Sequence, residues 1–222
     1  MFQTHLSLPK TKYLNSAEIY RQFIDGLQHT SLLEFVAVIT GIISVWFSKK
    51  ENIWVYPTGL INTIIYIYIS IKGNLPGEAS VNIFYTIMSV YGWILWSKKD
   101  QQNHVVLIVK YSSVKEWIGQ LVFFGLLYVV IYFSLVYLKN NFAPGAIPAA
   151  DAFASASAYT GMWLMARKKV ESWLWWIVTN IASIPLYFVK GYVFTSFQFV
   201  VLLIMAFMGL VAWHKKARYA RD

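Results

Sequence analysis

The sequence contains a series of apolar stretches, each close to twenty residues long, separated by short segments that carry lysine and arginine. A helix needs about twenty apolar residues to cross the hydrocarbon core of a bilayer. We expect seven such spans, at residues 32–48, 53–71, 79–97, 118–138, 146–166, 171–189 and 192–213. The chain is 58% hydrophobic and 13% charged, which is more apolar material than one soluble core of this length buries. These features predict an all-α integral membrane protein.

Residues 1–31 precede the first span and are mostly polar. They hold no apolar run long enough for a signal-peptide core, so we expect this segment to be retained. Ser16 can cap a short helix that places Ile19, Phe23 and Leu27 on one side. We predict that this helix lies at the membrane surface.

Lysine and arginine are divided unevenly between the two sides that seven spans define. Thirteen of the 19 fall on one side: Lys49, Lys50, Lys98, Lys99, Lys110, Lys115, Arg167, Lys168, Lys169, Lys215, Lys216, Arg218 and Arg221. Cytoplasmic loops carry such an excess, so we expect the N-terminus outside and the C-terminus in the cytoplasm of an inner-membrane protein. The net charge of +9 then reflects these loops and calls for no nucleic-acid partner.

The chain contains an internal repeat. A shift of 118 places Asn62 on Asn180 and Lys72 on Lys190, and a shift of 117 places Glu34 on Asp151, Gly92 on Gly209 and Trp96 on Trp213. This repeat predicts two three-helix bundles, residues 32–97 and 146–216, joined by a loop and linker helix at 98–145 and followed by a tail at 217–222. Because one helix separates them, both bundles cross in the same direction. Parallel repeats of this kind occur in transporters, which hold the substrate between the halves near the midplane.

The span at 171–189 carries polar and aromatic side chains on one face. Trp173, Trp176, Asn180 and Tyr187 are spaced by three, four and seven residues, which places them on one helical stripe. Tryptophan at the end of a span is also typical of an interfacial belt, and this alternative stays open for Trp173. A carboxamide deeper in the span needs a partner, so the position of Asn180 favours a wall that faces a polar path.

Further carboxamides lie on other spans, and two aromatic residues complete the candidate substrate site. The candidates are Trp173, Trp176, Asn180, Asn62, Asn82, Gln198, Tyr187 and Tyr66. Tryptophan faces bind flat aromatic cations, while carboxamides both donate to and accept from hydroxyl and amide groups. For each carboxamide taken singly, an interhelical hydrogen bond is the alternative.

Glu34 and Asp151 place one acid at the outer end of the first helix in each half. They are candidates for a gate that attracts a cation. The alternative is that each acid only complements the positive end of its helix dipole. Both lie too close to the predicted surface for a proton-coupling pair, so ion coupling is not expected.

Three stretches resemble the PnuC family of vitamin transporters: WVYPTGLINTIIYIYI at 54–69, NIFYTIMSVYGWILW at 82–96 and ESWLWWIVTNIASIPLYFVKG at 171–191, with the W-x-x-W pair at Trp173 and Trp176. The resemblance covers about residues 32–216. It implies a seven-helix core distantly similar to the SWEET transporters and facilitated diffusion of a vitamin that a cytoplasmic kinase then traps. It also implies that Trp173, Trp176 and Asn180 contact the ligand.

Within this family nicotinamide riboside is the expected substrate, with thiamine and riboflavin as alternatives. The stretch NLPGEA at 74–79 departs from the Leu-Tyr-Ala-Asp pattern of many members, which leaves the substrate open.

Enzyme classes find little support in the sequence. The chain has no cysteine, its four histidines fall in the tail or near the cytoplasmic face, and it has no Walker A motif. We therefore expect no catalysis, no cofactor and no metal. A receptor or scaffold that does not transport is the alternative class, and a homo-oligomer is compatible with either.

Overall fold

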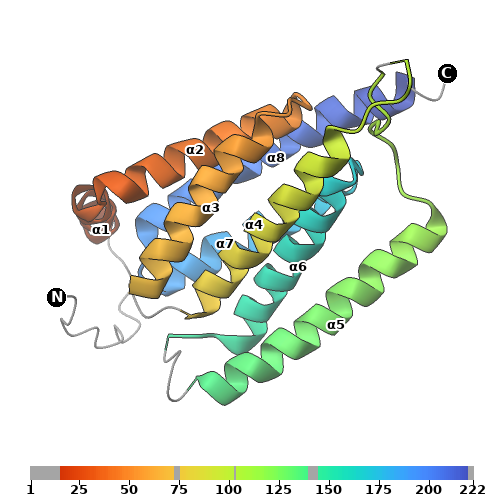
Figure 1. The fold of residues 1–222 in the computed structure, drawn as a ribbon. Helices are drawn as coiled ribbons and strands as arrows, with labels where there is room; N and C mark the ends of the chain where they lie inside the picture. Colours follow the sequence, from red (N-terminus) through yellow and green to blue (C-terminus); the bar gives the residue numbers. More distant parts are fainter. Residues whose placement is uncertain (1–15, 73–75, 103, 140–144, 220–222) are drawn as a thin grey trace.

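The computed structural model describes residues 16–72, 76–102, 104–139 and 145–219. Within them the chain forms eight helices: α1 Ser16–His29, α2 Leu32–Lys49, α3 Val55–Lys72, α4 Pro76–Trp96, α5 Val114–Leu138, α6 Pro148–Ala166, α7 Ser172–Val189 and α8 Val193–Tyr219 (Figure 1). The described residues contain no β-strand, and the all-α prediction is confirmed for them.

Each predicted span corresponds to one helix, with differences at two ends. α5 begins at Val114, before the predicted 118, because Ser113 and Glu116 form a capping box in which each side chain accepts a hydrogen bond from the other residue's backbone N–H. α8 continues to Tyr219, so the predicted tail at 217 begins too early. The basic residues of this last turn suit the negative end of the helix dipole. Residues 220–222 lie outside the described residues.

Five of the helices are long and apolar enough to cross a membrane: α2, α4, α5, α7 and α8. α6 is rich in alanine and serine, and most of its residues are buried. Small residues let helices approach closely, so a span that is enclosed by other helices needs few large apolar side chains. α3 and α6 are not among the five helices, so length and composition support five of the seven predicted spans.

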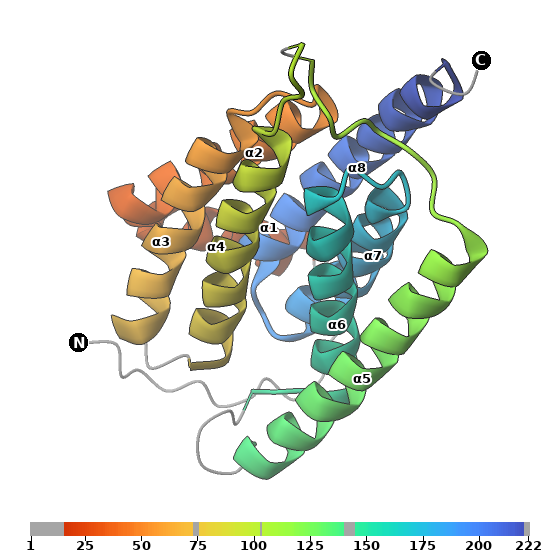
Figure 2. The same ribbon diagram turned by 45° about the vertical axis from the view of Figure 1, so that its right-hand side comes forward.

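The helices form two groups of three. α2, α3 and α4 pack in order, and so do α6, α7 and α8, while α5 packs along α6. The two groups meet where α4 contacts α6 and where α2 contacts α8. Figure 2 shows α5 at the side of the bundle, inclined away from α7 and α8 at its first residue.

α1 crosses the start of α8. The Phe23 ring lies 5.6 Å from the Phe194 ring and 5.4 Å from the Phe197 ring, measured between centroids. The predicted short helix is therefore present from Ser16, and its Phe23 packs against protein.

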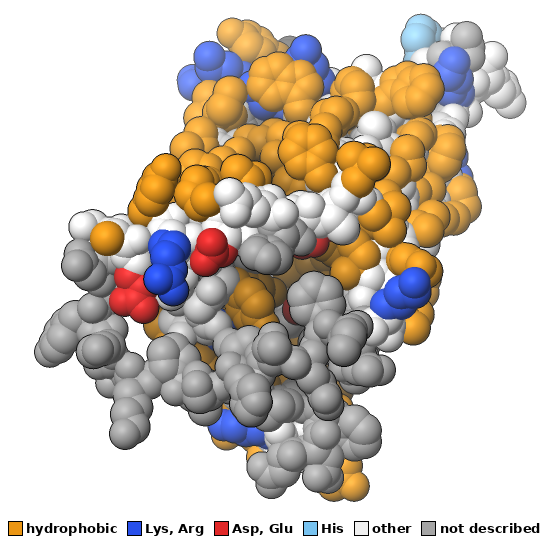
Figure 3. Space-filling view, turned by 90° about the vertical axis from the view of Figure 1, so that its left-hand side faces the viewer, with side chains coloured by type: hydrophobic (Ala, Val, Ile, Leu, Met, Phe, Trp, Pro, Cys, Tyr) orange, Lys and Arg blue, Asp and Glu red, His pale blue; other side chains and the backbone are white. Residues whose placement is uncertain are grey.

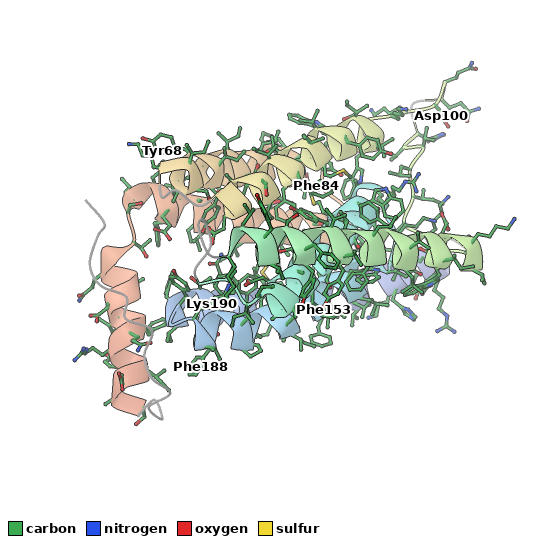
Figure 4. All side chains as sticks on the ribbon, turned by 90° about the horizontal axis from the view of Figure 1, so that it is seen from below. Tyr68, Phe84, Asp100, Phe153, Phe188 and Lys190 are labelled. Carbon is green, nitrogen blue, oxygen red and sulfur yellow. The ribbon has the colours of Figure 1, made fainter. Side chains whose placement is uncertain are left out.

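The two ends of the bundle differ in charge. We call the end formed by the last turns of α2, α4, α6 and α8 the basic end, because the lysine and arginine residues assigned to the cytoplasm cluster in these segments (Figure 1). Figure 3 looks onto the opposite end, where acidic side chains lie beside basic ones. Lys190 and Tyr68 lie at this opposite end, far from Asp100 at the basic end (Figure 4).

Candidate functional site

Four aromatic side chains meet between α4, α6 and α7. This aromatic box consists of Phe84, Tyr85, Tyr159 and Trp176. The Tyr85 ring lies 6.1 Å from the Trp176 ring, and the Tyr159 ring lies 4.4 Å from Phe84 and 6.2 Å from Tyr85. Figure 4 shows Phe84 on α4 in the middle part of the bundle. The box therefore joins the first group of helices to the second.

The Trp176 ring packs against Gly161 of α6. A Cβ atom added to Gly161 would meet the Trp176 ring at 3.3 Å, so a larger residue would press on the indole. One turn further along α7 lies Asn180, whose side chain is 3% exposed. Within the described part of the chain, no hydrogen bond joins its carboxamide to another group. Because this carboxamide has no hydrogen-bond partner among the described residues and lies one helical turn from the box, it can bind a ligand's hydroxyl or amide groups.

The other predicted asparagines make bonds within the protein. The Asn62 Nδ2 donates to the Ala37 carbonyl on α2 at 2.7 Å. The Asn82 Nδ2 donates to the Glu78 carbonyl of its own helix at 2.9 Å. For Asn62 the interhelical bond that was the alternative in the sequence is present, whereas the bond of Asn82 stays within its own helix.

The structure separates the two tryptophans of the W-x-x-W pair. Trp173 is 1% exposed, its ring stands at 89° to the Trp213 ring with 5.5 Å between centroids, and a Cβ added to Gly209 would lie 2.5 Å from it. Its indole nitrogen is buried without a partner among the described residues. Trp176 lies in the aromatic box, whereas Trp173 lies in the core of the basic end with no ring face free.

Three further predicted residues lie toward the opposite end. The Tyr66 hydroxyl on α3 lies within interaction range of the Gln198 side chain on α8. Tyr187 packs against Phe199 with 5.1 Å between ring centroids. Tyr187 follows Trp176 by eleven residues, which is about 16 Å along a helix. The predicted set therefore divides into a central part and a part near the opposite end.

The two candidate gate acids lie at the opposite end, as the sequence predicts. The Asp151 carboxylate accepts from Lys190 Nζ at 2.6 Å and from the Ile147 backbone N–H at 2.7 Å. This ion pair ties the start of α6 to the end of α7. Glu34 lies in the first turn of α2, where its backbone N–H donates to Ser31 Oγ at 3.2 Å.

A third acid at this end, Glu78 in the first turn of α4, was missed by the sequence reasoning. Lys190, Asp151 and Glu34 all lie within electrostatic range of it. Its position in the stretch that departs from the family pattern was the available signal.

Two reciprocal hydrogen bonds close the basic end between the groups. Trp96 Nε1 donates to the Ala166 carbonyl at the end of α6, and Trp213 Nε1 donates to the Ser48 carbonyl near the end of α2, both at 3.1 Å. Trp96 and Trp213 stand 117 positions apart, and so do Ser48 and Met165, the neighbour of Ala166. Each group therefore presents an indole to the helix end of the other.

An ion pair repeats this reciprocity. Glu51 follows α2 and Lys168 follows α6, again 117 positions apart, and Lys168 Nζ lies 3.1 Å from Glu51 Oε2. Both residues have positive φ, 56° and 51°, so the two loops share one unusual backbone shape. Lys216 also contacts Glu51, at 2.6 Å. We call Trp96, Trp213, Glu51 and Lys168, with their partners, the basic-end joint.

The packing behind the joint follows the same shift. Tyr56 stands at 84° to Trp96 with 5.2 Å between centroids, as Trp173 does to Trp213. A Cβ added to Gly92 would lie 2.5 Å from Tyr56, the counterpart of Gly209 beneath Trp173. All these pairs of equivalent residues are 117 positions apart, so the shift of 117 found in the sequence identifies them when it is applied to every residue of the first half.

These features describe a multi-pass membrane protein of the transporter class: its apolar helices form two groups, an aromatic box lies between the groups, and a joint closes one end. A family model described as "Nicotinamide mononucleotide transporter" matches residues 31–215. The chain belongs to this family of membrane transporters, and the resemblance to PnuC proteins is confirmed.

Several relatives share most of the chain. The nicotinamide riboside transporter PnuC of Escherichia coli K12 is 26% identical over 208 residues, covering 85% of this chain and 87% of the relative. The riboflavin/roseoflavin transporter RibM of Streptomyces davaonensis is 23% identical over 194 residues, covering 86% of this chain and 88% of the relative. The crystal structure of the vitamin B3 transporter PnuC superimposes with a TM-score of 0.68 at 24% identity, covering 90% of this chain and 88% of the other.

Proposed function

We propose that this chain carries nicotinamide riboside across the cytoplasmic membrane by facilitated diffusion. The observation that carries the proposal is the aromatic box with Asn180 one turn away, because a pyridinium ring needs aromatic faces and its amide and ribose need a carboxamide. One relative is named for nicotinamide riboside and another for riboflavin, so riboflavin is an alternative substrate. Thiamine is a further alternative. A receptor or scaffold without transport is the alternative class.

In this proposal Trp176 and Tyr85 contact the vitamin's ring, and Tyr159 forms a wall of the site. Cation–π and stacking contacts contribute roughly 0.5 to 2 kcal/mol each in such a site. Asn180 binds the amide or the ribose. Trp173 holds the first turn of α7 by packing on Trp213 and so positions Trp176, while Tyr66, Gln198 and Tyr187 line the path from the opposite end.

We further propose that α2–α8 are seven spans built as two parallel repeats, residues 32–97 and 146–216, with α5 as the linker helix in residues 98–145 and a distant similarity to SWEET transporters. The reciprocal contacts of the basic-end joint support this symmetry. The substrate would pass to the cytoplasm when the joint opens, and Glu34, Glu78 and Asp151 would attract the cation at the outer mouth. A cytoplasmic kinase would then retain the vitamin, and a homo-oligomer would cover part of the exposed face of α5.

The orientation can be tested with reporter fusions. Fusions after Lys99 and after Arg167 should report a cytoplasmic location, and a fusion after Lys72 should report an external one, because cytoplasmic loops carry the excess of lysine and arginine. Alkaline phosphatase and green fluorescent protein serve as paired reporters, each active on one side only. A cytoplasmic signal after Lys72 would contradict the orientation.

The transport mode can be tested in liposomes. In α2–α8, acidic and basic side chains lie near helix ends, so none of them is placed to carry a proton through the middle of the bundle. With zero membrane potential, labelled nicotinamide riboside should stop accumulating at equal concentrations inside and outside. A potential acting on a singly charged cation would shift this plateau by about 2.3 kcal/mol per 100 mV.

A proton or sodium gradient at clamped voltage should leave that plateau unchanged. Thiamine and riboflavin, tested in the same liposomes, should enter more slowly if the substrate assignment holds. A plateau that rises with either gradient would show coupling, and tight binding without uptake would favour the receptor class.

A further inference from the structure

A groove of about 450 Å³ opens sideways at the basic end, apart from the aromatic box. Its walls come from the start of α5, the start of α7 and the last third of α8, including Trp117, Leu174, Leu210, Val211, His214 and Lys215. It exists because α5 inclines away from α7 and α8 at this end, as Figure 2 shows. The groove therefore faces the surroundings of the bundle and not its interior.

The walls of the groove are apolar. Leu174 is 39% exposed and Val211 is 56% exposed, although both lie on helices apolar enough to span a membrane. Water in such a groove finds few hydrogen-bonding partners, and an empty groove would forfeit dispersion contacts. The material beside a membrane span is hydrocarbon, so an acyl chain fits this groove.

The rim of the groove is positively charged. Lys215 lines it, and Lys110 and Lys115 lie at the same end of the bundle, before and at the start of α5. None of these three lysines forms an ion pair with another residue in the described ranges.

Other lysines at this end do have acidic partners. Lys169 Nζ lies 2.6 Å from Glu116 Oε1, and Lys168 and Lys216 contact Glu51. Lys49, Lys50, Lys98 and Lys99 at this end also form no ion pair among the described residues, so it is its place on the groove wall that distinguishes Lys215.

One acid, Glu171, also lines the groove. Its carboxylate accepts from the Ser112 backbone N–H at 2.9 Å and from Ser112 Oγ at 2.8 Å, and the residue is 5% exposed. It is thus held inward by the loop before α5. Lys215 on the wall, without an ion-pair partner among the described residues, and a carboxylate that is already enclosed leave a site for an anion.

We propose that this groove binds one anionic phospholipid from the leaflet at the basic end. One acyl chain lies between Trp117, Leu174 and Val211, and the phosphate group lies beside Lys215. A lysine near an anionic membrane surface contributes about 1 kcal/mol to such binding. The lipid would bridge the linker helix α5 to α8 close to Trp213, which places it against the basic-end joint. This inference does not depend on which vitamin is carried.

The absence of cysteine from the chain allows a direct test. Leu174→Cys, labelled with bimane, is placed in nanodiscs that contain increasing fractions of brominated phosphatidylglycerol or brominated phosphatidylcholine. We expect half-maximal quenching at an about fivefold lower fraction of the phosphatidylglycerol, since one lysine contact of this size corresponds to that factor. Val211→Cys provides a second labelling position if the first variant folds poorly.

Two matched controls separate a site from general contact with lipid. Ile94→Cys lies on α4 near the same end and is 57% exposed, and it should show no preference between the two lipids. Lys215→Gln should reduce the preference at position 174, whereas Lys98→Gln should not. Equal quenching by both lipids would overturn the proposal. Absence of quenching by either, with disulfide cross-links between copies of the chain, would instead identify the groove as a protein interface and overturn it too.

Discussion

Replacing Glu51 with glutamine should open the basic end of the bundle. Lys168 keeps its ammonium group nearly buried, with a side chain 6% exposed, and its acidic partner in the structure is Glu51 at 3.1 Å. Removing one charge of a buried pair leaves the other uncompensated, and because glutamine still accepts a hydrogen bond we expect a loss of about 2 kcal/mol. That loss corresponds to an about 30-fold shift toward conformations in which Lys168 reaches water.

Spin labels at Lys50→Cys and Arg167→Cys measure this opening. Both residues are exposed, one beside Glu51 and one beside Lys168, and the chain has no other cysteine. Double electron–electron resonance should show a longer distance between the labels in the Glu51→Gln background. Asp100→Asn, also at the basic end, should leave the distance unchanged because Asp100 interacts with His104 in its own loop.

The double variant Glu51→Lys with Lys168→Glu tests the charge pairing itself. Both positions have a positive φ. Each of the two residue types already occurs with this backbone shape in the chain, so the exchange introduces no new backbone strain. The distance should return only part of the way toward that of the unmodified chain, because Lys216, which contacts Glu51 at 2.6 Å, then faces a lysine. An unchanged distance in Glu51→Gln, with the melting temperature preserved, would show that the ion pair does not hold the joint closed.

Trp176→Ala should weaken the binding of nicotinamide riboside by about tenfold or more. The indole offers a face to the aromatic box, where it lies 6.1 Å from Tyr85, and truncation removes both the stacking contact and the apolar area, worth at least about 1.4 kcal/mol. Trp176→Phe should retain part of the affinity because a ring remains. Isothermal titration calorimetry on the purified protein measures the dissociation constants.

Two other tryptophans make this prediction specific. Trp46→Ala removes an indole that is 40% exposed on α2 and should leave the affinity unchanged. Trp173→Ala should instead lower the melting temperature, since deleting a fully buried aromatic side chain costs about 3 to 5 kcal/mol. If a folded Trp176→Ala variant bound nicotinamide riboside with wild-type affinity, the aromatic box would contribute to packing and not to substrate binding.

The helices were predictable because length and apolar composition determine what can cross a bilayer. The segment at 146–166, whose alanine and serine give a weak hydropathy signal, forms the helix α6. The ends of α5 and α8 were less accurate, because a capping box and a run of basic helix formers extend helices beyond their apolar stretch. Hydropathy averages a window of residues and does not register either effect.

The candidate site was predictable only in part. Helical spacing placed Trp173 and Trp176 on one face of α7. That face contacts more than one neighbouring helix: Trp173 packs against Trp213 of α8, whereas Trp176 faces Tyr85 of α4. Asn62 and Asn180 are equivalent in the repeat, yet only Asn62 finds a carbonyl on the adjacent helix. Tyr85 and Tyr159 were missed because tyrosines are frequent in this chain, and spacing within one helix does not reveal which residues face another.

Two of the residue pairs that meet at the basic-end joint, unlike the pair Trp96 and Trp213, join different residue types. Where one half has Glu51 the other has Lys168, and where one has Ser48 the other has Met165, whose sulfur accepts from Ser48 Oγ at 2.9 Å. If two copies of the same half were paired, two carboxylates or two ammonium groups would occupy a place built for opposite charges. The duplicated halves have thus diverged into complementary partners, and a substitution in one copy can be compensated only by a matching change in the other.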